Sequence, residues 1–194
     1  MKNSKISIRP FQISDTLQVF QAIQESLAEV SPWLPDLNAE LTLDEIREYI
    51  EAQPQLRSER KAYNFVITGP QEESILGSCG LTQINWQHRF ANLYYWVRSS
   101  QTQRGVATDA TQSLARFGFK QLGLERIEIV MAVSNSASIR VAEKAGASRE
   151  GRLRHRISLY GKVHDAFMYS LIPSDLGFHQ KENYEPRSDS AKDS

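Results

Sequence analysis

The stretch that decides the fold of this chain is "NLYYWVRSSQTQRGVATDA", residues 92–110. An aromatic, β-prone run at 92–97 enters a polar corner that contains one glycine, and an amphipathic run follows. The pattern predicts a strand, then a helix that ends near Leu122 and is closed by Gly123. The N-terminus of a helix offers unpaired N–H groups and a positive dipole end, which suit an anion such as phosphate. The corner therefore predicts a diphosphate cradle, with an ordinary strand-to-helix turn as the alternative.

Two residues of the corner bear on this choice. Gly105 lets the backbone approach a ligand or adopt a dihedral angle that other residues resist. Arg104 offers a guanidinium fork that matches phosphate, or it points into solvent. No Gly-Lys-Ser/Thr sequence follows, and a single glycine cannot form the G-x-G-x-x-G fingerprint. The cradle, if present, is neither a P-loop nor a dinucleotide-binding loop.

Before this stretch, the chain predicts one strand and two helices. Alternating Ile6 and Ile8 indicate a strand that ends at Pro10. A helix follows with Ser14 or Asp15 as its N-cap, and its apolar face consists of Leu17, Phe20, Ile23 and Leu27. The loop "SPWLPDLNAE" exposes bulky residues between prolines, and a capping box of Thr42 and Glu45 opens a helix to about Ala52, followed by a polar connector.

Around the opening stretch, short loops separate three strand-like runs at 62–69, 74–84 and 90–98, which favours an antiparallel meander. A buried strand at 126–134 follows the central helix and is expected to lie parallel to 90–98. A short helix closed by Gly146 and a hairpin at 147–172 complete the order. We expect an α+β (α/β three-layer) fold: a mixed, mostly antiparallel sheet of about seven strands flanked by about four helices.

Bulk properties narrow the class of protein. The 194 residues carry a formal net charge of zero, which gives no reason to expect a nucleic-acid or anionic-membrane partner. One cysteine, no apolar leader and no apolar run of about 20 residues predict a cytoplasmic, soluble protein. We expect a single domain at 1–178 and a disordered tail at 179–194, where hydrophobic residues are scarce.

A second polar corner follows the strand at 126–134. Asn135 and Ser138 stand where that strand ends and the short helix begins. Both residue types are favoured helix caps, so a purely structural role is one interpretation. Because ligands of α/β sheets bind at the carboxyl ends of strands, the two adjacent corners together also predict a binding site.

These motifs, in this order, resemble one known family. "RGVATDA" after "YYWVRSS", then "NSASIRVAEKAGA" and "REGRL", look like the GNAT superfamily of acetyl-CoA-dependent N-acetyltransferases. The early "IRPF", the loop "SPWLPDL" and the closing "YGKVHDAFMYSLI" resemble its Rim-type branch, which includes the enzymes that acetylate N-termini of ribosomal proteins. The resemblance covers roughly residues 5–173. The family's loop pattern is Gln/Arg-x-x-Gly-x-Gly/Ala, and Thr102 departs from its first position.

The resemblance implies roles for individual residues. It places the diphosphate of acetyl-CoA on the corner and the pantetheine arm along the end of the preceding strand, with a backbone N–H near Val97 polarising the acetyl carbonyl. Ser138 would donate a proton to the leaving thiolate, and Asn135 would orient the arm. The implied coenzyme-binding set is Trp96, Val97, Gln103, Arg104, Gly105, Val106, Ala107, Thr108, Asn135 and Ser138.

The general base stays open at this point. His155 and Glu25 are candidates, against a hydrogen-bonded core histidine, a solvated helix face, or a water chain without a dedicated side chain. Trp33 lines the acceptor site or plugs the core beneath its loop. Alternation places His155 with Leu153, Ile157 and Leu159, opposite a stripe of arginines. We expect no metal, and we expect Cys79 to be an inert buried thiol.

The resemblance implies transfer of an acetyl group from acetyl-CoA to the α-amine of a protein or peptide by direct attack on the thioester. A small amine, such as an amino acid, a polyamine or an antibiotic, is the alternative acceptor. A coenzyme A binding module without catalysis is the alternative class. The expected state is a monomer or homodimer, with the loop at 31–40 as one possible dimer contact.

Overall fold

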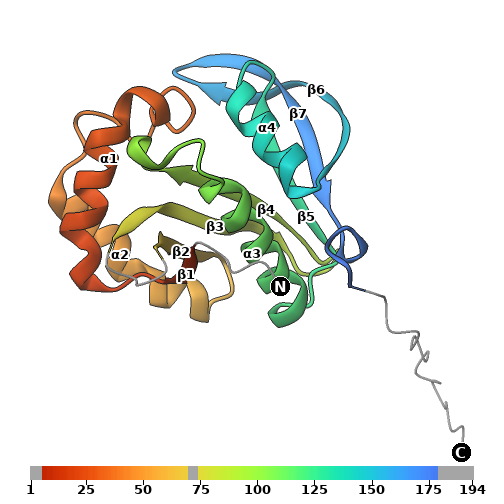
Figure 1. Ribbon diagram of the computed structural model, residues 1–194, viewed down its shortest axis with the longest axis horizontal. Helices are drawn as coiled ribbons and strands as arrows, with labels where there is room; N and C mark the ends of the chain where they lie inside the picture. The colour runs from red at the N-terminus through yellow and green to blue at the C-terminus, as the bar shows by residue number, and fades with distance from the viewer. Residues whose placement is uncertain (1–5, 70–73, 179–194) are drawn as a thin grey trace, which may run out of the picture.

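The computed structural model describes residues 6–69 and 74–178 (Figure 1). Its strands are β1 (Ser7–Pro10), β2 (Tyr63–Thr68), β3 (Ile75–Asn85), β4 (Phe90–Val97), β5 (Arg126–Ala132), β6 (Ser148–Leu159) and β7 (Lys162–Leu171). Its helices are α1 (Thr16–Val30), α2 (Leu43–Ser58), α3 (Val106–Gln121) and α4 (Ser136–Ala145), with short 3-10 turns η1 (Ile13–Asp15), η2 (Ser99–Gln101) and η3 (Pro173–Leu176). The tail predicted at 179–194 lies outside the described residues.

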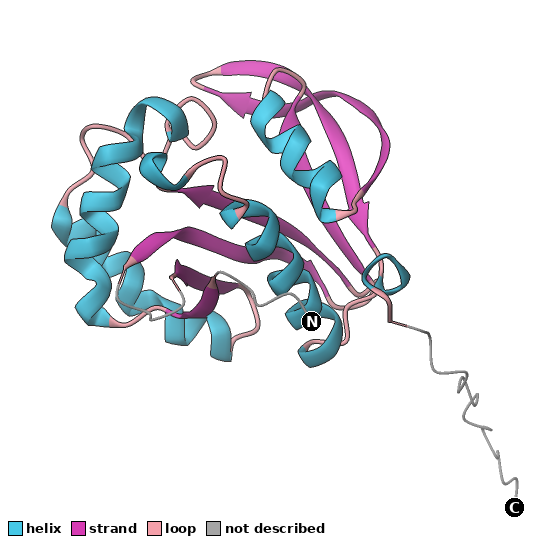
Figure 2. Cartoon of the chain, in the orientation of Figure 1, coloured by secondary structure: helices cyan, strands magenta, loops and turns pink. Residues whose placement is uncertain are grey.

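These elements form one seven-stranded sheet in the order β1-β2-β3-β4-β5-β7-β6. Every pair in it is antiparallel except β4 and β5, which run parallel as predicted. Helices cover both faces of the sheet (Figure 2). The predicted fold class is therefore confirmed. Among residues 6–69 and 74–178, none of the helices combines the length and the hydrophobicity that a membrane-spanning helix needs.

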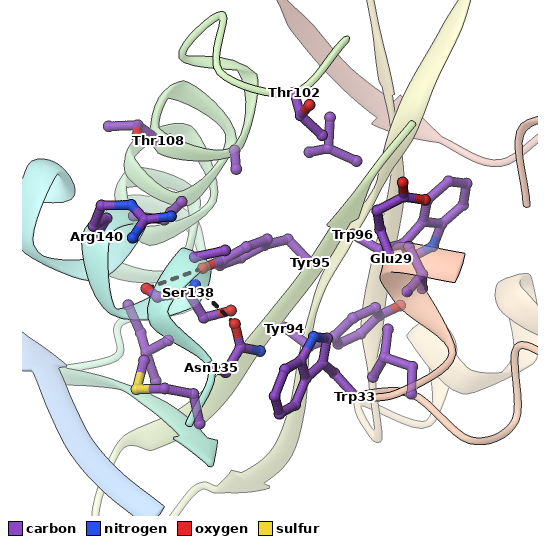
Figure 3. A pocket seen from close by; sticks show the side chains of 18 of the residues that line it. Glu29, Trp33, Tyr94, Tyr95, Trp96, Thr102, Thr108, Asn135, Ser138 and Arg140 are labelled. Carbon is purple, nitrogen blue, oxygen red and sulfur yellow. Dashed lines mark hydrogen bonds between the residues drawn. The ribbon is translucent and has the colours of Figure 1, made fainter. Parts of the chain in front are cut away.

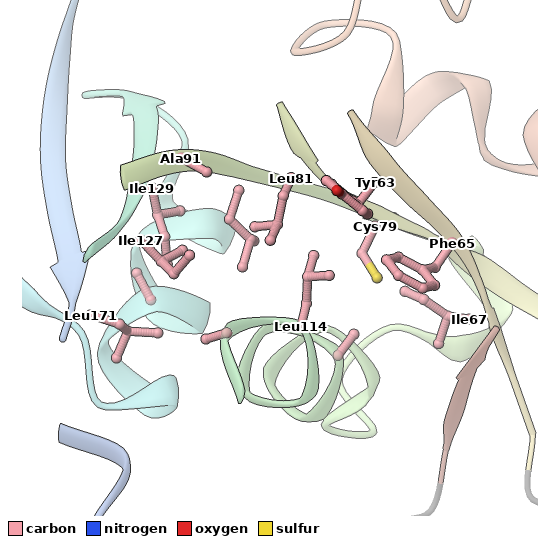
Figure 4. Packing of buried hydrophobic residues seen from close by; sticks show 14 of the residues in the cluster. Tyr63, Phe65, Ile67, Cys79, Leu81, Ala91, Leu114, Ile127, Ile129 and Leu171 are labelled. Carbon is pink, nitrogen blue, oxygen red and sulfur yellow. The ribbon is translucent and has the colours of Figure 1, made fainter. Parts of the chain in front are cut away.

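Strand alternation divides the core between the two faces of the sheet. On one face, Ala91 of β4 packs in a cluster with Leu114 of α3, and both are inaccessible to solvent (Figure 4). On the other face, Trp96 packs with residues of α1 and α2. Cys79 is buried in the first cluster, and burial raises the pKa of its thiol, which disfavours a reactive thiolate. The prediction of an inert thiol agrees with this environment.

The helix predicted to end near Ala52 continues to Ser58, although Pro54 lies inside it. The added turn is held by tertiary contacts: the guanidinium of Arg57 lies 4.8 Å from the ring centroid of Phe65 on β2 and 5.5 Å from that of Tyr63. Sequence reasoning treated this segment as a polar connector, and that prediction is wrong because packing on the sheet outweighs the local composition.

The loop at 31–40 also differs from expectation. Leu34 and Leu37 are partly buried against the α1–α2 cluster instead of being exposed. Backbone hydrogen bonds from Trp33 and Leu34 to the Val30 carbonyl, each 3.0 Å long, continue the end of α1 into the loop. The loop is therefore a packed extension of α1, and its apolar side chains already have partners within the chain.

A bulge in β6 overturns the predicted alternation around His155. Leu153 pairs with Ala166 and Ile157 pairs with His164. The three residues 154–156 of β6 therefore lie opposite a single residue of β7, Asp165. His155 is exposed, its φ is +51°, and its N–H donates to Asp165 Oδ1 at 2.9 Å. The expectation of a core histidine is wrong, because strict alternation does not survive a bulge.

The feature of the sheet that matters most for function is the divergence of β4 from β5. The two strands pair only where Phe90–Asn92 meets Arg126–Glu128. Beyond that point β4 continues beside β3, and β5 continues beside β7. The approach of β3 to β4 requires Gly77, because a Cβ there would lie 2.2 Å from the Trp96 carbonyl oxygen.

Candidate active site

A cavity of about 860 Å³ lies where β4 and β5 diverge (Figure 3). Its walls are the ends of both strands, the corner and first turn of α3, one side of α4, the end of α1 with the following loop, and the end of β6. Because α3 and α4 contribute to one face of the sheet while α1 and its loop lie on the other, the cavity joins the two faces through the gap between strands.

Unpaired strand edges face this gap. The Arg98 N–H donates to the Leu76 carbonyl at 2.8 Å, so even-numbered residues of β4 direct their backbone groups toward β3. The N–H and C=O of Tyr95 and Val97 therefore face the gap. By the same alternation, the Val133 N–H donates to the Asp165 carbonyl at 3.1 Å, which leaves the backbone of Val130 facing the gap from β5. An extended ligand with amide groups could pair with these edges.

The corner after β4 has the geometry of an anion cradle. Gln103 and Gly105 have left-handed φ values of +61° and +88°, and α3 begins immediately afterwards. The first intrahelical bond runs from the Asp109 N–H to the Gly105 carbonyl at 2.9 Å. Within the described part of the chain, the N–H groups of residues 106–108 have no acceptor. A Cβ at Gly105 would meet no atom within 4 Å, so the space in front of these groups is open.

Helix α1 fixes the segment that leads into this corner. Glu25 binds Arg98 Nε at 2.5 Å and the Ser100 N–H at 3.1 Å, and Ser26 Oγ accepts from the Ser99 N–H at 3.0 Å. The hydrogen bonds from Ser100 and Arg98 lower the pKa of Glu25. Glu25 does not line the cavity, and a low pKa opposes proton abstraction, so its position suits an anchor better than a base.

The second corner combines a cap with an open hydroxyl. Asn135 Oδ1 accepts from the Ser138 N–H at 3.0 Å, so Asn135 is the N-cap of α4. Tyr95 donates its hydroxyl to the Ser138 carbonyl at 3.4 Å, and burial raises the pKa of Tyr95 to about 12. The Ser138 side chain also lines the cavity, where its hydroxyl lies close enough to Tyr95 to interact with the phenol oxygen. A ligand in the cavity could accept a hydrogen bond from this hydroxyl.

The opposite end of the cavity is apolar with one acid. Trp33 and Leu34 follow α1, and Ile157 and Leu159 lie on β6. Glu29, one turn after Glu25, also lines the wall, and its Oε2 accepts from Ser99 Oγ at 2.7 Å. Figure 3 shows Glu29 and Trp33 on the same side of the cavity, across from Ser138.

The structure thus gathers most, but not all, of the predicted site residues. Arg104, Glu25 and His155 are not part of the wall; His155 and Arg154 line a separate surface depression. Thr102, which departs from the family pattern, is in the wall together with the predicted residues Trp33, Trp96, Val97, Gln103, Gly105, Val106, Ala107, Thr108, Asn135 and Ser138. Trp96 contributes differently from expectation, because its backbone pairs with β3 and its indole is in the core.

Among the lining residues that sequence reasoning missed, Glu29, Tyr95, Arg140 and Lys144 bear most on the chemistry. Arg140 and Lys144 are four residues apart on α4 and therefore share one helix face, a spacing that the sequence does display. No sequence pattern links Tyr95 and Glu29, because they line one cavity only as a result of the divergence of β4 from β5. In the described ranges, no group of three or more His, Cys, Asp and Glu residues could hold a metal.

The splayed parallel pair and the open helix N-terminus define the N-acyltransferase fold that the resemblance implied. The family described as "Acetyltransferase (GNAT) domain" matches residues 5–148. The chain belongs to this family of acetyltransferases, which confirms the predicted enzyme class.

Similar proteins agree with this assignment. The chain is 28% identical over 171 residues to "Putative ribosomal N-acetyltransferase YdaF" of Bacillus subtilis (strain 168), covering 88% of this chain and 92% of that protein. It is 29% identical over 110 residues to spermidine N(1)-acetyltransferase of Escherichia coli (strain K12), covering 57% and 56%. The structure of RimL, a ribosomal L7/L12 alpha-N-protein acetyltransferase in complex with coenzyme A, superposes with a TM-score of 0.80 at 21% identity, covering 88% and 95%. The name of the YdaF relative supports the resemblance to the Rim-type branch, and the RimL structure shows the same fold.

Proposed function

We propose that this protein transfers an acetyl group from acetyl-CoA to the N-terminal α-amine of a protein or peptide. The observation that carries the proposal is the cavity that joins the two faces of the sheet through the β4–β5 gap. A thioester donor can enter from the α3–α4 side and an amine from the α1–β6 side, so the two reactants meet between the strands. Proximity of this kind is a large part of catalysis for a two-substrate reaction.

The residues of the first side fit coenzyme A. The N–H groups of Val106, Ala107 and Thr108 would bind its diphosphate, and the open space at Gly105 admits it. Thr102 does not weaken this cradle, because the cradle needs only backbone donors. Arg140 and Lys144 add positive charge to the same end of the cavity, which suits an anionic ligand. The coenzyme supplies an activated thioester, and the exposed edge of β4 at Tyr95 and Val97 matches the amides of its arm.

Two groups of the chain would stabilise the transition state. The Val97 N–H faces the gap and would donate to the carbonyl oxygen as negative charge develops there. The Ser138 hydroxyl would donate to the departing sulfur. The attacking amine loses one proton overall and the thiolate gains one, so the reaction needs no net supply of protons.

The choice of an α-amine is supported by the positions of the two predicted bases, because neither of them is among the described residues of the cavity wall. Glu25 is bound to Arg98 and lies outside the wall, and His155 is exposed elsewhere. An α-amine with a pKa near 8 is about one-quarter neutral at pH 7.5, whereas a lysine or polyamine amine with a pKa near 10.4 is neutral in about one molecule per thousand. A site whose described wall lacks both predicted bases therefore favours an α-amine, which needs less help to lose its proton.

Charge also favours a peptide over a polyamine. Glu29 is the one carboxylate among the described residues of the wall, and the remaining acceptor side is aromatic and aliphatic. A polyamine carries several positive charges and would need several acidic partners. The similarity to a spermidine acetyltransferase keeps a small amine as the second candidate.

The test is a transfer assay with acetyl-CoA and a panel of peptides, amino acids and polyamines, in which release of free thiol reports turnover. Mass spectrometry of the products locates the acetyl group. We expect peptides with free N-termini to be modified on the α-amine faster than polyamines. Faster turnover of polyamines would favour the second candidate, and coenzyme binding without any thiol release would indicate a non-catalytic module.

A further inference from the structure

The cavity is polarised along its length. Arg140 and Lys144 lie at the α4 end, and Glu29 lies at the α1 end. Figure 3 shows Arg140 and Glu29 on opposite sides of the gap. The cationic end suits the anionic coenzyme. The acidic end therefore needs a separate explanation.

Glu29 is held in place but its charge is not neutralised. Ser99 Oγ donates to its Oε2 at 2.7 Å, and in the described ranges its Oε1 has no hydrogen-bond donor. Nor does any cation of the described chain lie within salt-bridge distance of it. The nearby cation Arg98 is already paired with Glu25 at 2.5 Å. One carboxylate oxygen thus stays available to a charged ligand.

The position of Glu29 is fixed by the fold and does not depend on a flexible loop. Val30, the next residue, is buried in the α1–α2 cluster, and Ser26, one turn earlier, binds the N–H of Ser99. Ser99, which both Ser26 and Glu29 bind, is followed a few residues later by the coenzyme corner. The position of the Glu29 carboxylate is therefore fixed relative to the corner that would hold acetyl-CoA.

We propose that Glu29, oriented by Ser99, forms an ammonium-binding subsite for the N-terminus of the acceptor, on the same side of the cavity as Trp33. This inference rests on the proposed function and names the group that recognises its substrate. A protonated amine would donate to Glu29 Oε1 in a charge-assisted hydrogen bond, and the Trp33 ring lines the same wall. After the amine loses one proton to solvent, a remaining N–H keeps the bond while the lone pair faces the gap.

The test compares two ligands that differ only at the amine. Tetra-alanine amide and its N-acetylated form are titrated into the coenzyme A complex, and calorimetry gives both affinities. We expect the wild type to prefer the free amine by about tenfold, the ratio that one charge-assisted hydrogen bond gives. Glu29→Gln should abolish this preference and leave the affinity for the acetylated peptide unchanged. Ser99→Ala should reduce the preference in part.

Glu48→Gln is the charge-matched control, because Glu48 is an exposed residue of α2 outside the cavity wall. It should keep the full preference. The inference is overturned if Glu29→Gln, with unchanged melting temperature and coenzyme affinity, still prefers the free amine, or if the wild type shows no preference. Because binding is measured without turnover, a Glu29-dependent preference would uphold the subsite even if the transfer assay failed.

Discussion

At the scale of single residues, Gly105 tests the coenzyme corner most directly. Its left-handed φ and the open space beside it place it in front of the free N–H groups of α3. Gly105→Glu should fill this space and repel a diphosphate, so we expect the affinity for acetyl-CoA to fall at least about 100-fold, equivalent to ~3 kcal/mol. Calorimetry measures this affinity directly.

A control is needed because any side chain at a left-handed position costs about 1 kcal/mol of stability. Gly123→Glu provides it, since Gly123 has a φ of +68°, an equally open surrounding and a position near the opposite end of α3. Both variants should lose stability, and only Gly105→Glu should lose the coenzyme. Undiminished affinity in Gly105→Glu would place the anion seat elsewhere.

Ser138 tests the chemistry rather than the binding. Its hydroxyl is open to the cavity, so Ser138→Ala should remove a donor to the departing sulfur. We expect kcat to fall by about 10- to 100-fold, with a smaller change in KM for acetyl-CoA, as for loss of a general acid. Steady-state kinetics should be compared with Ser136→Ala, a change at an exposed residue of the same helix. Unchanged turnover would remove Ser138 from the catalytic groups.

At the scale of elements, the β6–β7 hairpin contributes to the acceptor side. Tyr160 at its tip has a φ of +50°, is followed by Gly161 at +73°, and donates its hydroxyl to the Ser31 carbonyl at 2.8 Å. This bond connects the hairpin that carries Leu159 to the loop that carries Trp33, so it spans two walls of the cavity.

Tyr160→Phe should loosen these walls without disturbing the core. One exposed hydrogen bond contributes about 0.5–1.5 kcal/mol, so we expect KM for a peptide acceptor to rise by about 2- to 10-fold. The affinity for acetyl-CoA should stay the same, because the coenzyme corner lies on other elements. A parallel loss of coenzyme affinity, measured by calorimetry, would contradict a role confined to the acceptor side.

At the scale of the whole molecule, ion pairs hold the far half of the sheet together. Arg126 of β5 binds Glu150 of β6, and Ser170 of the intervening β7 donates to Glu150 at 2.7 Å. The hydrogen bonds from Arg126 lower the pKa of Glu150 to about 2. These contacts join β5, β7 and β6, which form the half of the sheet that diverges from β4.

Because the folded pKa of Glu150 lies below its unfolded value, its contribution to stability is complete above about pH 5 and disappears as the pH falls toward 2. Glu150→Gln should therefore lower the free energy of unfolding at pH 7, by about 1 kcal/mol or less since solvent screens the pair. Urea unfolding at several pH values should show this difference shrinking below pH 4.5. A difference that is independent of pH would show that the charge has no such role.

The sequence by itself determined the order of elements, the parallel β4–β5 pair, the capping box at Thr42 and the glycine corner, since these depend on local periodicity and backbone geometry. Local rules failed at the end of α2, where Arg57 packs on Phe65, and at the bulge around His155. Both failures come from contacts between segments distant in the chain.

The candidate site shows the same division. Backbone donors at residues 106–108 and the Ser138 hydroxyl could be placed from sequence, because each follows the end of a strand. The sequence could not show which of Glu25 and Glu29 lines the cavity, since both lie on one face of α1. Only the tertiary structure decides it: the neighbouring Arg98 and Ser100 engage Glu25, while Glu29, one turn further on, lines the gap that diverging strands open.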